Sequence, residues 1–177
     1  MKIAIVSYSL TGNNARFTDH LARALNADTI QISTLRPVNY ATITLDLIFQ
    51  RKPAINVSGD SLKSYDLVLL IAPVWMGQVA FPLRRCLDAL KSTAVPYGFL
   101  SVCGGADGIN PNLTQELTQR TGRAPVIVLE QHIRTLLPQE PAPTRDDTSA
   151  YRLTDEDCVC LTTQALAEIQ KQIPTAR

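Results

Sequence analysis

The sequence predicts a doubly wound α/β fold, a three-layer sandwich with helices on both faces of a five-stranded parallel sheet. Five apolar runs of strand length recur along the chain, with too little polar alternation for one face to be wet. Such strands are typical of a parallel sheet buried on both faces. Helical patterns separate the runs, and strands that alternate with helices form right-handed crossovers. The 177 residues suffice for one sizeable core but not for two, so we expect a single domain over residues 1–177.

The first half of the chain alternates between the two patterns. Lys2–Tyr8 is the first predicted strand, and the helix Ala15–Leu25 follows it with apolar residues at every fourth position. Thr29–Ile32 is the second strand. Tyr40–Lys52 is a weaker helix, because its β-branched residues disfavour helical rotamers. Leu67–Ala72 is an entirely apolar third strand.

The second half repeats the alternation. Pro82–Leu90 has leucines at helical spacing, and a proline is tolerated in the first turn. Gly98–Cys103 is the fourth strand. Pro111–Gly122 begins with proline and ends at glycine, which is the usual asymmetry of a helix. Val126–Glu130 is the fifth strand, and Thr154–Ile173 begins with a hydroxyl cap followed by acidic residues that suit the helix dipole.

Composition excludes several classes of protein. Apolar residues make up 45% and charged residues 19% of the chain, as in ordinary globular proteins. No apolar run approaches the roughly 20 residues that span a bilayer. With 17 basic and 16 acidic residues, the net charge of +1 gives no reason to expect nucleic acid as a partner. The N-terminus lacks the pattern of a signal peptide, so we expect a cytoplasmic protein.

The four cysteines are too scattered for a disulfide framework or a zinc site; they are Cys86, Cys103, Cys158 and Cys160. The last two are separated by one residue, whereas metal and redox pairs use two. We therefore expect free thiols in a reducing compartment and no metal.

The turn after the first strand has the residue types of an anion site. It reads Ser9-Leu10-Thr11-Gly12-Asn13-Asn14 and leads directly into a helix. The N–H groups of a helix N-terminus are unpaired and carry the positive end of the dipole. Ser9 and Thr11 add hydroxyls, and Gly12 lets the backbone curl around the anion. A phosphate is the expected occupant, although a capped helix without a ligand would look similar.

Two further loops follow predicted strands and are expected on the same edge of the sheet, where doubly wound folds bind ligands. The second loop contains Pro73-Val74-Trp75-Met76-Gly77, with the only tryptophan of the chain, whose indole suits a flat aromatic ligand or closes the core. The third reads Cys103-Gly104-Gly105-Ala106-Asp107-Gly108. Its glycines leave backbone N–H and C=O groups free to bind a heteroaromatic edge, or make it a plain connection.

These loops together resemble the flavodoxin-like family of FMN-binding proteins, and the resemblance covers nearly the whole chain in order and length. The phosphate loop of that family reads hydroxyl, any residue, Thr, Gly, Asn, Thr, and here Asn14 replaces the last hydroxyl. The second loop looks like the flavin-contact loop of the reductase-like branches. By that match Trp75 stacks on or flanks the isoalloxazine, with Met76 and Gly77 beside it. The third loop matches by position and glycine content, and it lacks the aromatic residue that flavodoxins often have there.

The resemblance implies a protein that binds FMN noncovalently and passes electrons from NAD(P)H to a quinone-like or other small acceptor. No catalytic side chain is predicted, because the flavin carries the reaction. Two alternatives remain. One is a flavodoxin-type electron carrier that docks to redox protein partners, but such carriers are usually strongly acidic and this chain is not. The other is a flavodoxin-fold protein that has lost the flavin. Pro138–Tyr151, proline-rich and charged, is predicted as a loop or an extended excursion.

Overall fold

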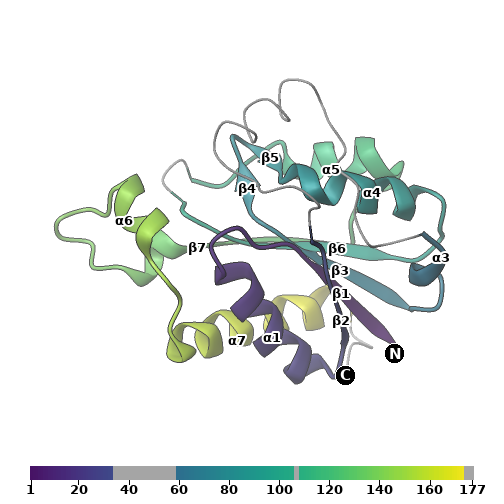
Figure 1. Ribbon diagram of the computed structural model, residues 1–177, viewed down its shortest axis with the longest axis horizontal. Helices are drawn as coiled ribbons and strands as arrows, with labels where there is room; N and C mark the ends of the chain where they lie inside the picture. The colour runs from purple at the N-terminus through teal and green to yellow at the C-terminus, as the bar shows by residue number, and fades with distance from the viewer. Residues whose placement is uncertain (34–58, 106–107, 174–177) are drawn as a thin grey trace.

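The computed structural model describes residues 1–33, 59–105 and 108–173, and these residues form a parallel sheet between two layers of helices (Figure 1). The five strands have the order β2-β1-β3-β6-β7 and all pair in parallel. Their bounds are Asp28–Gln31, Ile3–Ser7, Leu67–Ile71, Tyr97–Cys103 and Ile127–His132. The predicted strands are thus confirmed to within two residues at each end. The chain runs outward from β1 to β2 and then returns to β3, so the strand order reverses beside β1, where doubly wound folds open a ligand crevice.

Helices cover both faces of the sheet (Figure 1). On one face lie α1 (Asn13–Leu25) and α7 (Asp155–Gln172), which pack against each other. On the other face lie α4 (Arg84–Lys91) and α5 (Leu113–Thr121). The short helix α3 (Gly59–Leu62) precedes β3. These layers confirm the predicted three-layer arrangement.

Two apolar cores result from the alternation of side chains along the strands. Ile3 and Ile5 of β1 belong to the core beneath α1 and α7, with Phe17 as its largest helical side chain. Ala4 and Val6 belong to the opposite core beneath α4 and α5. All residues of β1 and β3 are buried, which confirms that apolar runs without alternation mark strands covered on both faces.

The edge strand β2 departs from that expectation. Three of its four residues are exposed and Ile30 is half-buried, and among the described residues β2 is an edge strand that pairs with β1 alone. The predicted helix Tyr40–Lys52 lies outside the described residues. No helix among the described residues is long and apolar enough to cross a membrane.

Two segments predicted as loops contain regular structure. The loop after β3 forms a two-stranded hairpin, β4 (Val74–Trp75) and β5 (Gln78–Val79), and a 3₁₀ turn precedes α4. The predicted excursion Pro138–Tyr151 contains a helix, α6 (Arg145–Ala150). A capping box joins Thr144 and Asp147 at its N-terminus, and this pair satisfies the first N–H groups of so short a helix. A second 3₁₀ turn, Ile133–Leu136, follows β7.

Candidate functional site

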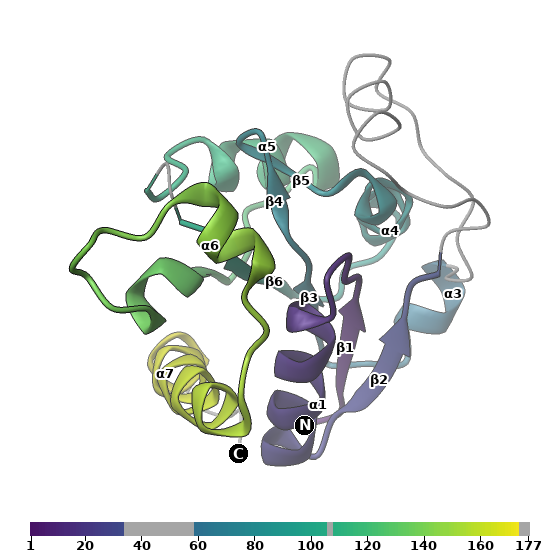
Figure 2. The same ribbon diagram turned by 60° about the vertical axis from the view of Figure 1, so that its left-hand side comes forward.

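The three loops predicted to carry a site converge on one cavity of about 550 Å³. The cavity lies beyond the carboxyl ends of the strands, where the β1–α1 turn, the β4–β5 hairpin and α6 gather at one end of the sheet (Figures 1 and 2). Of the sixteen residues predicted as a site, most line it: Leu10, Thr11, Asn13, Asn14, Pro73, Val74, Trp75, Met76, Gly77, Cys103, Gly104, Gly105 and Gly108. Ser9 and Gly12 are not among the lining residues. Asp107 lies outside the described residues.

The first loop is held by its own hydroxyl. Ser9 Oγ accepts a hydrogen bond from the N–H of Gly12 at 3.0 Å, which closes the turn before α1. Gly12 has a φ of 94°, a conformation that favours glycine. The first turn of α1 contains no acidic residue, so no carboxylate of its own opposes an anion at the positive end of the helix dipole. This N-terminus is therefore a candidate anion site, and Thr11 lines the cavity next to it.

The two asparagines at the start of α1 are buried and bind distant backbone. Asn14, 3% exposed, exchanges two hydrogen bonds with Val102 of β6, at 2.9 and 3.0 Å. Asn13 donates to the carbonyl of Tyr151 and accepts from the N–H of Leu153, both at about 3 Å. Both amides are thus engaged with backbone, and the N–H groups of the first helical turn remain as donors for an anion.

Asn14 extends the ladder of the sheet. Strand β3 pairs with β6 only as far as Leu100, whose carbonyl accepts from Ala72. Val102 lies two residues further on, so its backbone N–H and C=O point to the same edge of β6 as those of Leu100. At that position β3 no longer pairs with β6. The Asn14 amide takes that place and fixes the start of α1 to the end of β6.

The second loop is a tight hairpin that carries the tryptophan. Its two turn residues, Met76 and Gly77, have φ values of 49° and 76°, as a two-residue hairpin turn requires. The Trp75 ring meets Tyr8 edge-on, with centroids 5.8 Å apart, and meets Phe81 at 5.3 Å. Trp75 therefore both closes the core and lines the cavity.

The third loop packs closely against its neighbours through two glycines. A Cβ at Gly104 would lie 3.0 Å from Thr148 Oγ1 of α6. A Cβ at Gly105, whose φ is 79°, would lie 2.5 Å from His132 Cβ. The same loop contacts the hairpin, because Asn110 donates its side-chain amide to the carbonyl of Gly77. Because they have no side chain, these two glycines allow the third loop to pack closely against α6 and His132 in the wall of the cavity.

Helix α6 is one part of the cavity that the sequence did not predict, and Glu130 of β7, together with Ile133 just after that strand, is another. Arg145, Thr148 and Ser149 line the wall next to the third loop. The pattern Thr144-x-x-Asp147 is a helix N-terminus signal that would have predicted this helix. Of the described lining residues, only Arg145 and Glu130 carry a formal charge.

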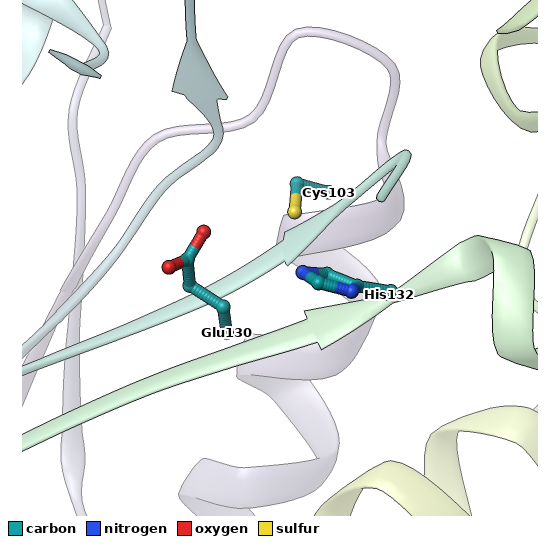
Figure 3. Close-up of side chains that lie close together, drawn as sticks. All are labelled: Cys103, Glu130 and His132. Carbon is teal, nitrogen blue, oxygen red and sulfur yellow. The ribbon is translucent and has the colours of Figure 1, made fainter. Parts of the chain in front are cut away.

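Cys103, Glu130 and His132 form a cluster at the ends of β6 and β7 (Figure 3). One potential ligand atom from each lies within 4.8 Å of the others. Burial, together with the nearby carboxylate of Glu130, raises the pKa of the Cys103 thiol to about 11. The thiol is therefore protonated at neutral pH in the absence of a cation. Burial also raises the pKa of Tyr8, which meets the Trp75 ring, to about 12.

Comparisons with known proteins place the fold. No protein-family model matches the chain, and no curated protein has a similar sequence. Solved structures do match. A flavoprotein from Lactobacillus acidophilus NCFM in complex with FMN has a TM-score of 0.62 and 21% identity, over 73% of this chain and 92% of that chain. A flavodoxin from the domain Archaea has a TM-score of 0.53 and 16% identity, over 97% and 99%. A flavodoxin from Streptococcus pneumoniae TIGR4 has a TM-score of 0.57 and 14% identity, over 98% and 100%.

These neighbours are flavodoxins and flavoproteins of the same architecture, and the chain therefore has the flavodoxin-like fold that the sequence predicted. The identities establish the fold, whereas the function has to be argued from the site itself.

Proposed function

We propose that the cavity binds FMN noncovalently and that the protein is an oxidoreductase that passes electrons from NAD(P)H to a quinone-like or other small acceptor. The observation that carries the proposal is the convergence of an open helix N-terminus, a tryptophan hairpin and a glycine loop on one cavity of about 550 Å³. Cavities that bind small molecules and cofactors have volumes of about 300–1,000 Å³. The structural neighbour in complex with FMN supports the same choice.

The residues present suit a phosphate at one end of the cavity. The N-terminus of α1 offers backbone N–H groups, and no acidic side chain opposes an anion in its first turn. Thr11 lines the same space and could add its hydroxyl. We assign the phosphate to the segment Ser9–Asn14, with backbone donors doing most of the binding because the Asn13 and Asn14 amides are engaged elsewhere.

The other end suits a flat aromatic ring. Trp75 is fixed by Tyr8 and Phe81, so it presents its ring to a ligand without losing freedom on binding. We expect the hairpin residues Pro73–Gly77 and the segment Cys103–Gly108 to contact the ring. FMN, when bound, supplies the electron and hydride chemistry, and the protein orients the ring and excludes water from it.

The mouth of the cavity supports a small apolar acceptor. Leu10, Met76 and Ile109 line the cavity and are 36%, 78% and 76% exposed. A flat apolar molecule such as a quinone would remove these side chains from water. The net charge of +1 gives no long-range attraction to a basic partner protein, which is why we place the electron carrier second. The four cysteines are free, and this supports the cytoplasmic location that the sequence predicts.

Titration of flavin-free protein with FMN, followed by flavin fluorescence, tests the cofactor. We expect saturable binding at one site per chain. Thr11→Val removes a hydroxyl beside the phosphate and should weaken binding roughly 10-fold, since hydrogen bonds to charged groups contribute about 1.5–3 kcal/mol. Trp75→Ala should weaken it by about 5-fold or more. Thr114→Val, at an exposed position of α5 away from the cavity, is the control and should leave affinity unchanged. Absence of FMN binding to the unmodified protein would favour the alternative that the flavin has been lost.

A second assay separates the reductase from the carrier. NADPH or NADH added to the FMN-loaded protein under argon should bleach the flavin absorbance within seconds, and a quinone should restore it. A flavin that stays oxidised with both nucleotides, yet accepts electrons from a reduced redox protein, would refute the reductase and support the carrier.

A further inference from the structure

The ends of β6 and β7 bring together a thiol, a carboxylate and an imidazole that lie far apart in the sequence. Cys103 is directly opposite His132 in the parallel register, and Glu130 lies two residues before His132 on the same face of β7. The ligand atoms of all three lie within 4.8 Å of one another, and their side chains point toward a common space (Figure 3).

The three groups are gathered but not bonded to one another. His132 Nε2 is buried and has no hydrogen-bond partner among the described residues. Glu130 uses one carboxylate oxygen to accept from the N–H of Asn110 at 3.0 Å, and its second oxygen has no hydrogen-bond partner among the described residues. Cys103 is a free thiol. Buried polar groups in folded proteins are normally satisfied, so the free His132 nitrogen calls for a further partner.

We propose that Cys103, Glu130 and His132 bind a divalent cation of the zinc class, with three protein ligands and a fourth position open to the cavity. Zinc takes sulfur, nitrogen and oxygen ligands at about 2.0–2.3 Å, which places tetrahedral ligand atoms about 3.5 Å apart. Binding of the ion would draw the three ligand atoms, which now lie within 4.8 Å of one another, to that spacing. A thiolate and a carboxylate together balance the two positive charges of the ion. Cys103 and Glu130 both line the cavity, so the remaining position faces it.

The surroundings hold these ligands in place, as the outer partners of metal ligands do. Gly105 packs against His132 so closely that a Cβ would lie 2.6 Å from the imidazole Cγ. The N–H of Asn110 orients the Glu130 carboxylate. Cys103 belongs to the last residue pair between β6 and β7, which fixes its distance from His132.

Cobalt(II) is the probe, because a cobalt–thiolate bond absorbs in the near ultraviolet and identifies the sulfur ligand. Purified flavin-free protein under reducing conditions should bind one Co²⁺ per chain with that absorption, and Zn²⁺ should displace it. Cys103→Ser should abolish the thiolate band and weaken binding at least 100-fold. Glu130→Gln and His132→Gln, which keep similar volumes, should each weaken binding at least 10-fold. Circular dichroism establishes that each variant is folded.

Cys160→Ser is the matched control, because Cys160 is the exposed thiol of the chain and the place where cobalt would bind adventitiously. This variant should keep both the band and the affinity. A wild-type protein without the thiolate band, or a band that survives Cys103→Ser and is lost in Cys160→Ser, overturns the proposal. FMN affinity is measured separately, in the absence of metal. The cobalt assay therefore tests only the metal site, and the FMN titration tests only the cofactor.

Discussion

Replacement of Asn14 by alanine should destabilise the protein through the loss of two buried hydrogen bonds. The side chain makes two buried hydrogen bonds, one donated to the carbonyl of Val102 at 2.9 Å and one accepted from its N–H at 3.0 Å. Alanine leaves both backbone groups of Val102 without a partner at the end of β6, where β3 no longer pairs. We expect the start of α1 to lose its hydrogen-bonded connection to the end of β6.

The magnitude follows from the two bonds. A net contribution of about 0.5–1.5 kcal/mol for each bond, and a larger cost where a buried group is left unpaired, gives a loss of about 2–4 kcal/mol in the free energy of unfolding. For a chain of this length such a loss lowers the melting temperature by about 5–15 °C. Urea unfolding followed by circular dichroism measures it.

Two further variants separate hydrogen bonding from packing. Asn14→Asp keeps the shape and the acceptor but loses the donor, and it places a carboxylate oxygen against the Val102 carbonyl. It should be at least as destabilising as alanine at neutral pH. Asn112→Ala, at an exposed asparagine without a side-chain cap bond, should change stability by less than about 0.5 kcal/mol. An Asn14→Ala protein as stable as Asn112→Ala would refute the role of the amide in the ladder.

Three other outcomes are expected. Gly98→Ala should lower the free energy of unfolding by about 1–3 kcal/mol, because its Cβ would lie 2.4 Å from Ile127 Cγ2. A double-mutant cycle with Ile127→Ala should show a favourable coupling energy, and strict additivity of the two changes would contradict the clash. Thr154→Ala should cost about 1 kcal/mol in urea unfolding, through loss of the capping box of α7; no change would mean that Asp157 caps the helix without it. Partial burial raises the pKa of Asp157, but hydrogen bonds from Thr154 and the Tyr151 hydroxyl outweigh it and lower that pKa below its ordinary value. The carboxylate therefore stabilises the fold above its unfolded pKa of about 3.9, and this contribution is lost as pH falls through the lower folded value. The Asp157→Asn protein should accordingly lose less stability than wild type between pH 5 and 2, and equal losses would contradict the assignment.

Much of the fold followed from local sequence patterns. Leu67–Ile71 is apolar at every position, and it lies in the middle of the sheet with both faces covered. The turn at Gly12 and the start of α1 followed from the hydroxyl and glycine residues of one short segment. Each of these features depends on residues within a few positions of one another, which is the range that periodicity and turn chemistry report.

The errors came from weak local signals. The Val74–Val79 hairpin is built from two-residue strands, which are too short for alternation to be seen. Helix α6 has six residues and no apolar periodicity, so its capping residues Thr144 and Asp147 are the local signal that predicts it. Strand β2 was predicted as buried, but it lies at an edge of the sheet. The residues of a strand do not indicate whether it lies at the edge or in the middle.

By itself, the sequence determined the order of strands and helices, the parallel sheet and the three loops that meet at its carboxyl edge. The tertiary structure alone decided what each side chain contacts there. Asn14 reaches Val102 across 88 positions of sequence, and Cys103 meets Glu130 and His132 only because β6 and β7 pair in one register. Hydrophobic periodicity indicates which face of an element is buried. Contacts between residues far apart in the sequence depend on how whole elements pack, and no local pattern encodes them.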